Sequence, residues 1–520
     1  MTLDIIVKRN SLRKPDKPAV ITADTSYTWK EFDQRITRLA NALLDKGLNK
    51  GDRVAVLLSN CSEYLELYFA AARSGLILVP LNYRLTANEI AELLQHACPK
   101  LLIFGEEFVL QSDELKPLLP ELDKRWVIGG VARKNTHSYE QMVNEASMSP
   151  VIADLNEHDT LAIFYTSGTT GLPKGAMVSH YNLEMNGYNQ FMADGSLAED
   201  INLISTPIYH MGAVFMAVSY MMLGCTQIVL RKFDAKSWLQ TIQDRAATVS
   251  LLIPTMINTI LNEETLGDYD VSNLRLIFYG GGPMPAPVLE RAIDKFKCGF
   301  TQGYGLTETL EATFLVTEDH VLHGSEDQQR RLNSAGREAV GADIRIVSDD
   351  GMDLIEGEVG EILIKSRSVI SGYWEMPELT RKVIKDGWFY TGDMGYLDNE
   401  RYLFVVDRKK DMVISGGVNI YTKEIESVLY QHPCVLEAAV IALTDLEWGE
   451  VVTAVVVQRP SVEVNATELI EHCKSKLASY KKPRKLFFVE ELPKNPSGKI
   501  LKRDLRTRLQ DQEADYTSET

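Results

Sequence analysis

Strand and helix signals alternate along two long stretches of this chain, and this alternation limits the possible folds more than any other feature of the sequence. The predicted elements are strands at 52–58, 77–81, 101–104, 248–253 and 274–279, and helices that begin near residues 26 and 61 or span 87–95, 237–246 and 255–263. Successive strand–helix–strand units favour parallel pairing, with the helices packed on the faces of the sheet. The sequence therefore predicts an α/β fold with doubly wound, largely parallel sheets.

Two further regions depart from this pattern. Between Gly341 and Ile370, short segments of alternating polarity flank Asp349-Asp-Gly, which predicts an antiparallel, β-rich subdomain. Beyond the charged segment at 407–411, the signals follow the order β-α-β-β-α-β, which is typical of a small α+β module. A chain of 520 residues exceeds one ordinary domain. We place the boundary between Lys409 and Lys410, which gives a large N-terminal domain (1–409) and a small, mobile C-terminal domain (410–520).

The composition argues against several classes of protein. A net charge of −17 argues against a nucleic-acid-binding surface. The six cysteines form no C-x-x-C pair and no zinc-type spacing, which fits reduced thiols. The N-terminus lacks the apolar core of a signal peptide, and polar residues interrupt the most apolar stretch, 213–230. We predict a cytoplasmic protein without a transmembrane segment, and leave open weak peripheral membrane association and a homodimer.

One loop is rich in groups that bind phosphate. The run Tyr165–Gly175 reads Tyr-Thr-Ser-Gly-Thr-Thr-Gly-Leu-Pro-Lys-Gly and follows an apolar strand at 159–164. Its glycines let backbone N–H groups approach an anion, its hydroxyls donate hydrogen bonds, and Lys174 adds a positive charge. The Walker A pattern fails because Pro173 precedes this lysine and Gly175 follows it, and the Rossmann glycine spacing fails as well. The loop has the chemistry of a triphosphate site, although its composition alone does not name the nucleotide.

The segment Thr166–Gly175 resembles the phosphate loop of the adenylate-forming superfamily, whose members include acyl-CoA synthetases, luciferases and the adenylation domains of peptide synthetases. The resemblance extends from about residue 18 to residue 506, with further motifs in the order that the family shows. It implies that ATP or AMP is bound by Thr166, Ser167, Gly168, Thr169, Thr170, Gly171 and Lys174.

Two further motifs extend the predicted nucleotide site. Gly280-Gly-Gly-Pro follows a strand, and consecutive glycines there suggest either a tight turn or a ligand close to the backbone. The resemblance implies that Gly281 and Gly282 form a wall of the adenine and acyl pocket. In Gln302-Gly-Tyr-Gly-Leu-Thr-Glu, it implies that Tyr304 stacks on adenine, Thr307 contacts the α-phosphate and Glu308 binds Mg²⁺. The remaining residues that it assigns here are Gln302 and Gly303 at the nucleotide, and Thr166 beside Glu308 at the metal.

The resemblance also assigns residues on both sides of the predicted domain boundary. Asp393, read alone, is a turn or capping aspartate, but its motif resembles the family's ribose-binding segment, with Arg408 as the second ribose contact. Lys410 occupies the hinge position, about which the small domain would turn to present two faces to one site.

Two segments of the small domain would form those two faces. Ser415, Gly416 and Gly417 resemble the loop that lines the pantetheine tunnel for CoA. The family usually has proline where this chain has Thr422, and we expect this threonine to cap the helix that follows. Lys499, in a Pro-Ser-Gly-Lys context, matches the catalytic lysine that bridges carboxylate and α-phosphate oxygens and stabilises developing negative charge.

One histidine completes the set. An isolated histidine is more often structural, but His210 follows Thr-Pro-Ile-Tyr, where the family places a residue that gates the acyl carboxylate and is not a general base. We include it with Lys499, Glu308 and Thr307 among the residues expected to act in the reaction.

The resemblance implies an ATP- and CoA-dependent acyl-CoA synthetase that uses Mg²⁺ and forms an acyl-adenylate. A fatty acid is our first choice of carboxylic acid because the candidate lining residues are largely apolar, and an aryl acid such as a cinnamate or benzoate is the second. A peptide-synthetase module is disfavoured because no carrier domain follows Lys499. Two rivals of other classes share the fold, a luciferase-like oxygenase and an inactive nucleotide-binding homologue.

Overall fold

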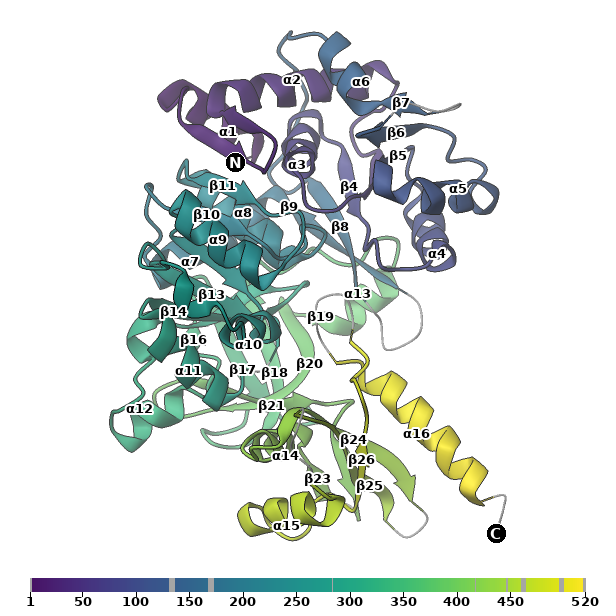
Figure 1. The fold of residues 1–520 in the computed structure, drawn as a ribbon. Coiled ribbons are helices and arrows are strands. Elements are labelled where there is room, and N and C mark those ends of the chain that lie inside the picture. Colours follow the sequence, from purple (N-terminus) through teal and green to yellow (C-terminus); the bar gives the residue numbers. More distant parts are fainter. Residues whose placement is uncertain are drawn as a thin grey trace.

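The computed structural model describes residues 2–130, 136–166, 173–282, 284–416, 418–445, 448–459, 464–494 and 500–517, and of 511–517 the backbone alone. The described helices are α1 (Asp4–Arg13), α2 (Trp29–Asp45), α3 (Ser62–Ser74), α4 (Ala87–Ala97), α5 (Val109–Leu118), α6 (Tyr139–Glu145), α7 (His180–Asp194), α8 (Met211–Met222), α9 (Ala235–Arg245), α10 (Pro254–Leu261), α11 (Ala286–Phe296), α12 (Glu326–Arg331), α13 (Pro377–Val383), α14 (Thr422–Tyr430), α15 (Ala466–Lys476) and α16 (Lys502–Thr517). Figure 1 shows α1 and α2 at one end of the molecule and the C-terminal strands at the other.

Two large sheets confirm the predicted α/β architecture. Within the described ranges, one sheet has the order β16-β15-β14-β13-β12-β10-β11-β1-β2 and the other the order β7-β6-β5-β3-β4-β8-β9. Both have a parallel centre. The first sheet is antiparallel at both edges, and the second is antiparallel at the β8–β9 edge alone. The first sheet contains β1 (Pro18–Ile21), β2 (Ser26–Thr28), β10 (Ile201–Ile204), β11 (Thr226–Val229), β12 (Val249–Leu252), β13 (Leu276–Gly280), β14 (Gly299–Leu306), β15 (Leu310–Leu315) and β16 (Arg337–Glu338). The second contains β3 (Arg53–Leu57), β4 (Ile77–Pro80), β5 (Leu101–Gly105), β6 (Arg125–Ile128), β7 (His137–Ser138), β8 (Thr160–Thr166) and β9 (Lys174–Ser179).

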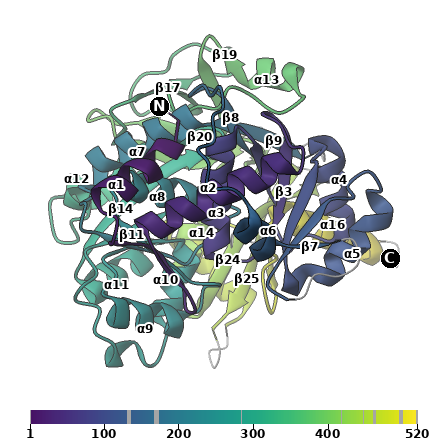
Figure 2. The same ribbon diagram turned by 90° about the horizontal axis from the view of Figure 1, so that it is seen from above.

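The main core joins the two sheets through the helices between them. One buried cluster includes Phe32 of α2, Val56 of β3, Phe69 of α3, Phe215 of α8 and Phe278 of β13. Helix α2 begins where Thr28 and Glu31 form a capping box, and its apolar side chains recur at helical spacing, so that one face is buried. Seen from above, α2 lies across this junction, over α3 (Figure 2). Burial of apolar surface on both sides of the helices therefore fixes the two sheets relative to each other.

Helix α8 accounts for the apolar stretch at 213–230. Nearly all of its side chains are buried, and the strand β11 follows it. A helix that is apolar on every side is typical of a protein core. In the described part of the chain, no helix is both long and apolar enough to cross a membrane.

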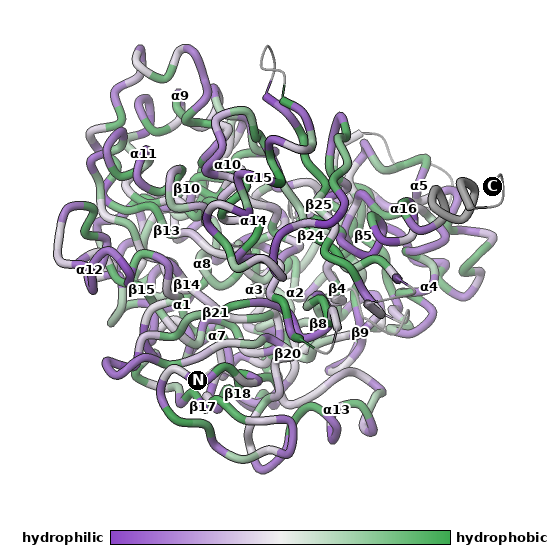
Figure 3. Tube along the Cα trace, turned by 90° about the horizontal axis from the view of Figure 1, so that it is seen from below, coloured by the Kyte–Doolittle hydropathy of each residue, from purple (hydrophilic) through white to green (hydrophobic). Residues whose placement is uncertain are grey.

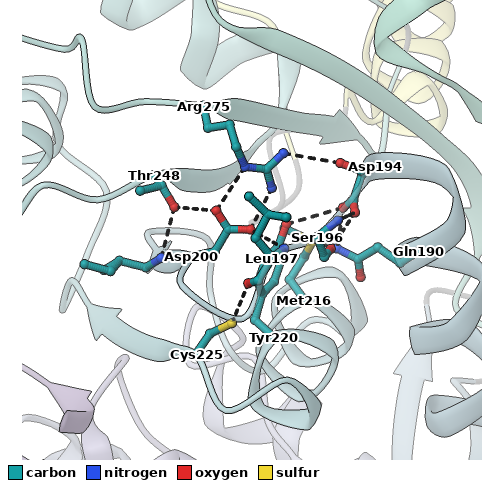
Figure 4. Close-up of polar contacts among 11 residues, drawn as sticks. Gln190, Asp194, Ser196, Leu197, Asp200, Met216, Tyr220, Cys225, Thr248 and Arg275 are labelled. Atoms are coloured by element: carbon teal, nitrogen blue, oxygen red, sulfur yellow. Dashed lines mark hydrogen bonds and ion pairs between the residues drawn. The ribbon is translucent and has the colours of Figure 1, made fainter. Parts of the chain in front are cut away.

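A partly buried polar network holds together the starts of three parallel strands (Figure 4). The Arg275 guanidinium donates to both carboxylate oxygens of Asp200, at 3.0 and 2.7 Å, and to the backbone oxygen of Asp194 at 3.3 Å. The Thr248 hydroxyl donates to Asp200 at 2.8 Å and accepts from the Ile201 amide at 3.0 Å. A bidentate pair of this kind is strong and directional. The network ties the loop after α7 to β10, β12 and β13, at the end of the sheet opposite to the predicted site.

Two smaller sheets follow. The third has the order β17-β18-β20-β19, with β21 paired to β20, and confirms the predicted β-rich subdomain. The fourth has the order β23-β22-β25-β24, with β26 paired to β25. The strands of the third sheet are β17 (Ala342–Val347), β18 (Gly360–Ser366), β19 (Ile384–Lys385), β20 (Trp388–Leu397) and β21 (Leu403–Arg408), and those of the fourth are β22 (Val413–Ser415), β23 (Val418–Ile420), β24 (Val435–Asp445), β25 (Gly449–Gln458) and β26 (Lys485–Phe488). Figure 3 shows hydrophobic colouring in β24 and β25 and hydrophilic colouring along the outer turns near α12.

The C-terminal module differs from its predicted order in two places. The short strand β23 pairs with β22 before α14 begins, and α16 adds a helix after β26. The chain leaves the third sheet at Arg408 and enters the fourth at Val413, so the segment between these residues, which contains Lys410, connects the two sheets.

Acid is expected to destabilise the fold through His180. This side chain is 1% exposed, and its Nδ1 accepts a hydrogen bond from the Leu3 amide at 3.3 Å. Burial lowers the pKa of His180 from 6.5 to about 4. Because the unfolded chain binds the proton first, this contribution to stability is complete above pH 6.5 and is lost as the pH falls through 4. The loss is on the order of 3 kcal/mol. Chemical unfolding of the wild type and of His180→Asn, whose oxygen replaces Nδ1 as acceptor, measures it. Parallel pH profiles of the two proteins would contradict the expectation.

Candidate functional site

The predicted site residues gather at the carboxyl ends of parallel strands. Strands β10, β12, β13 and β14 run parallel, so the segments that follow them meet at one edge of the sheet. His210 follows β10, Gly281 and Gly282 follow β13, and Thr307 and Glu308 follow β14. Open α/β sheets bind ligands at this edge.

The two ends of the phosphate-loop motif lie on paired strands. Thr166 ends β8, Lys174 begins β9, and the two residues are directly paired across the antiparallel strands. The sequence predicted the strand before the loop and the Ser179 cap after it, but not β9 between them. The predicted nucleotide-binding residues that lie outside the described part of the chain are Ser167, Gly168, Thr169, Thr170 and Gly171.

A carboxylate faces these paired strands. Oε1 of Glu308 accepts a hydrogen bond from the Tyr373 hydroxyl at 2.7 Å and lies 3.5 Å from the Thr166 hydroxyl. Lys174 lies over the Tyr373 ring, with its Nζ 5.7 Å from the ring centroid. Burial raises the pKa of Tyr373 far above its ordinary value, so its hydroxyl keeps its proton and donates to the carboxylate. The structure thus brings Thr166, Lys174 and Glu308 together, and adds Tyr373, which sequence reasoning missed because it lies in no recognised motif.

The turn between β14 and β15 sets the position of Glu308. The Leu306 amide donates to the Thr309 hydroxyl at 2.9 Å, and the Ile370 amide donates to the Glu308 backbone oxygen at 2.9 Å. Thr307 lies in the same turn. A side chain on Gly305 would overlap the backbone of Leu310, so only glycine permits this close turn. Backbone contacts therefore hold the carboxylate in place before any ligand binds.

Tyr304, Asp393 and Arg408 form a second group. The Tyr304 hydroxyl donates to Oδ2 of Asp393 at 2.9 Å, and Nε of Arg408 contacts Oδ1 at 2.5 Å. Asp393 and Arg408 are directly paired on β20 and β21, and Asp393 is only 4% exposed. Asp393 is therefore a strand residue and not the turn or capping aspartate that its local sequence suggests. Burial and the neighbouring carboxylate raise the pKa of Tyr304 well above its ordinary value, which keeps the phenol neutral.

A lysine of the C-terminal module approaches this second group. Lys423, at the start of α14, lies near the carboxylates of Asp393, Asp407 and Glu426. Burial lowers its pKa, and these carboxylates oppose that effect. Sequence reasoning missed Lys423 because no local pattern indicates that α14 packs against β21.

The glycines near the site fall into two groups, which differ in what surrounds each glycine. A Cβ atom on Gly280 would lie 2.7 Å from the Gly303 carbonyl oxygen, and one on Gly303 would lie 2.6 Å from both Oε2 of Glu311 and the Phe278 ring. Packing between strands therefore requires glycine at these two positions. Gly281 has a φ of +76°, and a Cβ on Gly282 would meet nothing within 4 Å. Among the described residues the space beside Gly282 is thus open, whereas Gln302 pairs with Tyr279 and Leu315 within the sheet.

His210 is neutral, and its Nε2 has no hydrogen-bond partner among the described residues. It stands immediately before α8, and its ring packs on Tyr209 with centroids 4.4 Å apart. Its Nε2 is buried and makes no hydrogen bond with any described residue. Burial lowers the pKa of His210 to about 4, so the imidazole carries no charge near neutral pH. It can offer one hydrogen bond to a ligand.

The segment around the predicted hinge lies close to the paired strands β8 and β9. Burial lowers the pKa of Lys410, and Arg408, Arg506 and Lys174 lower it further, whereas Asp411 raises it. Asp411 in turn is held by Arg506 of α16 at 2.8 Å. The hinge segment is therefore anchored to α16 and lies within electrostatic reach of Lys174.

The predicted CoA-tunnel loop follows β22. Ser415 pairs with Val418 and Gly449, and Gly416 has a φ of +57° and donates its amide to the Trp448 backbone oxygen at 2.9 Å. Gly417 and the predicted catalytic Lys499 lie outside the described residues.

Thr422 does not cap α14 as expected. It is the first residue of that helix, and its hydroxyl donates to the carboxylate of Asp407 at 2.8 Å. Asp407 also accepts from the Thr422 amide, so a side chain fifteen positions earlier satisfies the helix end.

Comparison with known proteins agrees with this arrangement. Residues 7–374 match the model of the AMP-binding enzyme family, and residues 424–499 match that of the AMP-binding enzyme C-terminal domain. A fatty acid–[acyl-carrier-protein] ligase of Streptomyces coeruleorubidus is 35% identical, with 95% of this chain and 94% of that protein covered. A feruloyl-CoA synthase of an Amycolatopsis species is also 35% identical, with 96% and 98% covered. The ATP-bound crystal structure of MatB from Rhodopseudomonas palustris superposes with a TM-score of 0.88 at 31% identity, with 98% and 99% covered.

The matches cover nearly the whole chain, and the relatives join carboxylic acids to thiols. The chain therefore belongs to the AMP-binding enzyme family and is an adenylate-forming acid–thiol ligase.

Proposed function

We propose that this chain is an ATP- and CoA-dependent acyl-CoA synthetase that converts a carboxylic acid, ATP and CoA into acyl-CoA, AMP and pyrophosphate through an acyl-adenylate. The observation that carries the proposal is the pair of preformed groups at the end of β14, Thr166–Glu308–Tyr373 and Tyr304–Asp393–Arg408. The first offers oxygen ligands and a nearby lysine, and the second offers an aromatic ring beside a carboxylate.

The nucleotide would be held by both groups. Asp393 would accept hydrogen bonds from the ribose hydroxyls, with Arg408 orienting the carboxylate, and Tyr304 would stack on the adenine. Lys174, Thr307 and the loop residues Ser167–Gly171 would contact the phosphates, with Gly281, Gly282, Gln302 and Gly303 forming the wall beside the base.

The residues at Glu308 suit a magnesium ion bound together with the triphosphate. One carboxylate and one hydroxyl are hard oxygen ligands, and Mg²⁺ in nucleotide sites takes most of its remaining ligands from phosphates and water. Such an ion neutralises phosphate charge as pyrophosphate leaves. In this account Tyr373 fixes the Glu308 carboxylate, and Thr166 supplies the second oxygen.

The reaction would use two faces of the C-terminal domain. In the first step the carboxylate of the acid attacks the α-phosphorus and pyrophosphate leaves, with Lys499 stabilising the negative charge and His210 contacting the acid. The domain comprising residues 410–520 would then turn about Lys410 relative to residues 1–409. Ser415, Gly416 and Gly417 would then guide the CoA thiol to the acyl carbon, which releases AMP.

Membership of the family leaves two features of the reaction open. The first is the acid, for which we favour a fatty acid, with an aryl acid as the alternative that the feruloyl-CoA relative supports. The second is the acceptor, since one relative uses an acyl carrier protein and the other CoA. Action in the cytoplasm, association with membranes and a homodimer remain predictions.

The proposal is tested by AMP release with a panel of fatty, aryl and amino acids, with either CoA or a phosphopantetheine-loaded carrier protein as acceptor. AMP and a thioester formed in equal amounts with CoA and one class of acid would support it. Turnover with the carrier protein alone would show that the acceptor is a carrier protein and not CoA. The absence of turnover with every acid would refute the proposed function.

Replacing Asp393 by asparagine is expected to raise the KM for ATP about 10-fold, because a neutral amide holds ribose hydroxyls more weakly than a carboxylate. The variant would also leave Arg408 without its charged partner. Initial rates with ATP varied at saturating acid and CoA measure the effect. Tyr304→Phe, which removes only the 2.9 Å hydrogen bond and keeps the ring, is expected to change this KM less. An unchanged KM in Asp393→Asn would contradict the ribose assignment.

A further inference from the structure

Two polar side chains meet within the apolar core beside the site. Glu311 lies on β15, and its backbone amide donates to Oδ1 of Asn186 on α7 at 3.0 Å. Oε2 of Glu311 and Nδ2 of Asn186 are both buried, and neither makes a hydrogen bond with any described residue. The Asn186 side chain is 0% exposed. A hydrogen-bond acceptor and a donor, on residues in direct contact, are thus both left unpaired.

The Glu311 carboxylate lies against Gly303, one of the residues proposed to form the wall beside the base. Its Oε2 lies 2.6 Å from where a Cβ of Gly303 would stand, next to the ring of Phe278. Phe278 packs edge-on against Phe215 of α8 and Phe314 of β15, with ring centroids 5.7 and 6.2 Å apart. Glu311 is three residues beyond Glu308, on the strand that follows the turn, and its carboxylate lies beside the ring of Phe278.

This arrangement is unfavourable for the protein alone. Burial raises the pKa of Glu311 to about 7, and none of the described lysine, arginine or histidine side chains forms an ion pair with it. A buried donor or acceptor without a partner destabilises a fold, and apolar residues of similar shape would serve the core better. Glu311 as a whole residue is only partly buried, whereas its Oε2 is fully buried.

We propose that Glu311 and Asn186 bind a hydroxyl group on the acyl part of the substrate, so that the ligase selects a hydroxylated acid. The hydroxyl donates to Oε2 of Glu311 and accepts from Nδ2 of Asn186, which satisfies both atoms at once. A plain alkyl or aryl group satisfies neither atom, an ammonium group has no lone pair for Asn186, and a second carboxylate is repelled by Glu311. The inference rests on the proposed function and deepens it by naming the substrate class.

The aromatic rings around Glu311 fit either a hydroxyaryl acid or a hydroxylated fatty acid, and matched substrate pairs separate the two sources. The measurement is kcat/KM for thioester formation with cinnamate against 4-hydroxycinnamate, and with dodecanoate against 12-hydroxydodecanoate. Because the hydroxyl gains a hydrogen bond to a charged group, kcat/KM is expected to be about 10- to 100-fold higher for the hydroxylated member of at least one pair. Glu311→Leu is expected to bring that ratio close to one.

A matched control comes from the same helix. Asn189 of α7 accepts from the Gly341 amide at 3.1 Å and lies outside the proposed pocket, so Asn189→Ala is expected to keep the preference, whereas Asn186→Ala loses it. Glu311→Leu is also expected to melt no lower than the wild type, because it removes an unpaired buried carboxylate.

The outcomes separate the two claims. Turnover without preference for the hydroxylated member of either pair, or a preference that survives Glu311→Leu, would overturn the inference and leave the ligase intact. That result, with a lower melting temperature in Glu311→Leu, would indicate a structural water between the two side chains. The absence of turnover with all four acids and with the wider panel would instead refute the proposed function.

Discussion

Replacing Lys499 by alanine is expected to slow formation of the acyl-adenylate about 10³-fold. A lysine ammonium that bridges the attacking carboxylate and the α-phosphate oxygens stabilises charge that develops only in the transition state, so its loss lowers kcat more than it raises KM. Acid-dependent release of pyrophosphate in a single turnover, without CoA, measures this step.

The second half-reaction supplies the control. A reaction that starts from chemically prepared acyl-adenylate and CoA bypasses the adenylation step in which Lys499 is expected to act. Lys499→Ala is therefore expected to retain most of the wild-type rate of thioester formation. Lys494, in the same segment, forms an ion pair with Glu437 on the surface of β24, and Lys494→Ala is expected to behave as the wild type in both steps. Equal losses in both half-reactions of Lys499→Ala would indicate a structural role and contradict the assignment.

Replacing Glu308 by glutamine is expected to reduce adenylation about 100-fold and to raise the Mg²⁺ concentration needed for half-maximal rate. The change removes the negative charge beside Thr166 and keeps the shape of the side chain. The Tyr373 hydroxyl can still donate to the amide oxygen at this position, so the local packing is expected to survive. Titration of the adenylation rate with Mg²⁺ at fixed ATP checks both effects.

Tyr373→Phe is the matched comparison for this site. It removes the 2.7 Å hydrogen bond to Glu308 but leaves the carboxylate and the ring beneath Lys174, so a loss of about 10-fold is expected. A Glu308→Gln enzyme whose Mg²⁺ dependence equals that of the wild type would remove Glu308 from the metal site.

Local patterns were sufficient to predict the large sheets. The alternation of apolar strands and amphipathic helices reports periodicity within single elements, and the parallel cores of both large sheets follow from it. The helix after the phosphate loop was placed correctly because Ser179 is a local capping signal. Strand β9 was not found, since its glycine and short length hide the alternation that its pairing with β8 creates.

The site was predictable only as far as its residues belong to motifs. Tyr304 and Asp393 are 89 positions apart, and nothing in either local sequence indicates their 2.9 Å contact. Tyr373, Lys423 and Glu311 were missed for the same reason, because tertiary packing alone brings them to the motif residues. Likewise, the capping of α14 by Asp407 depends on how β21 approaches the helix, which no spacing rule supplies.

The central claim, an acyl-adenylate formed at one site before the thiol reacts, is tested most directly by exchange of labelled pyrophosphate into ATP. The account predicts exchange that requires the acid and does not require CoA, with AMP released in quantity only after CoA is added. Exchange without any acid, or a thioester formed with ADP and phosphate as products, would contradict it.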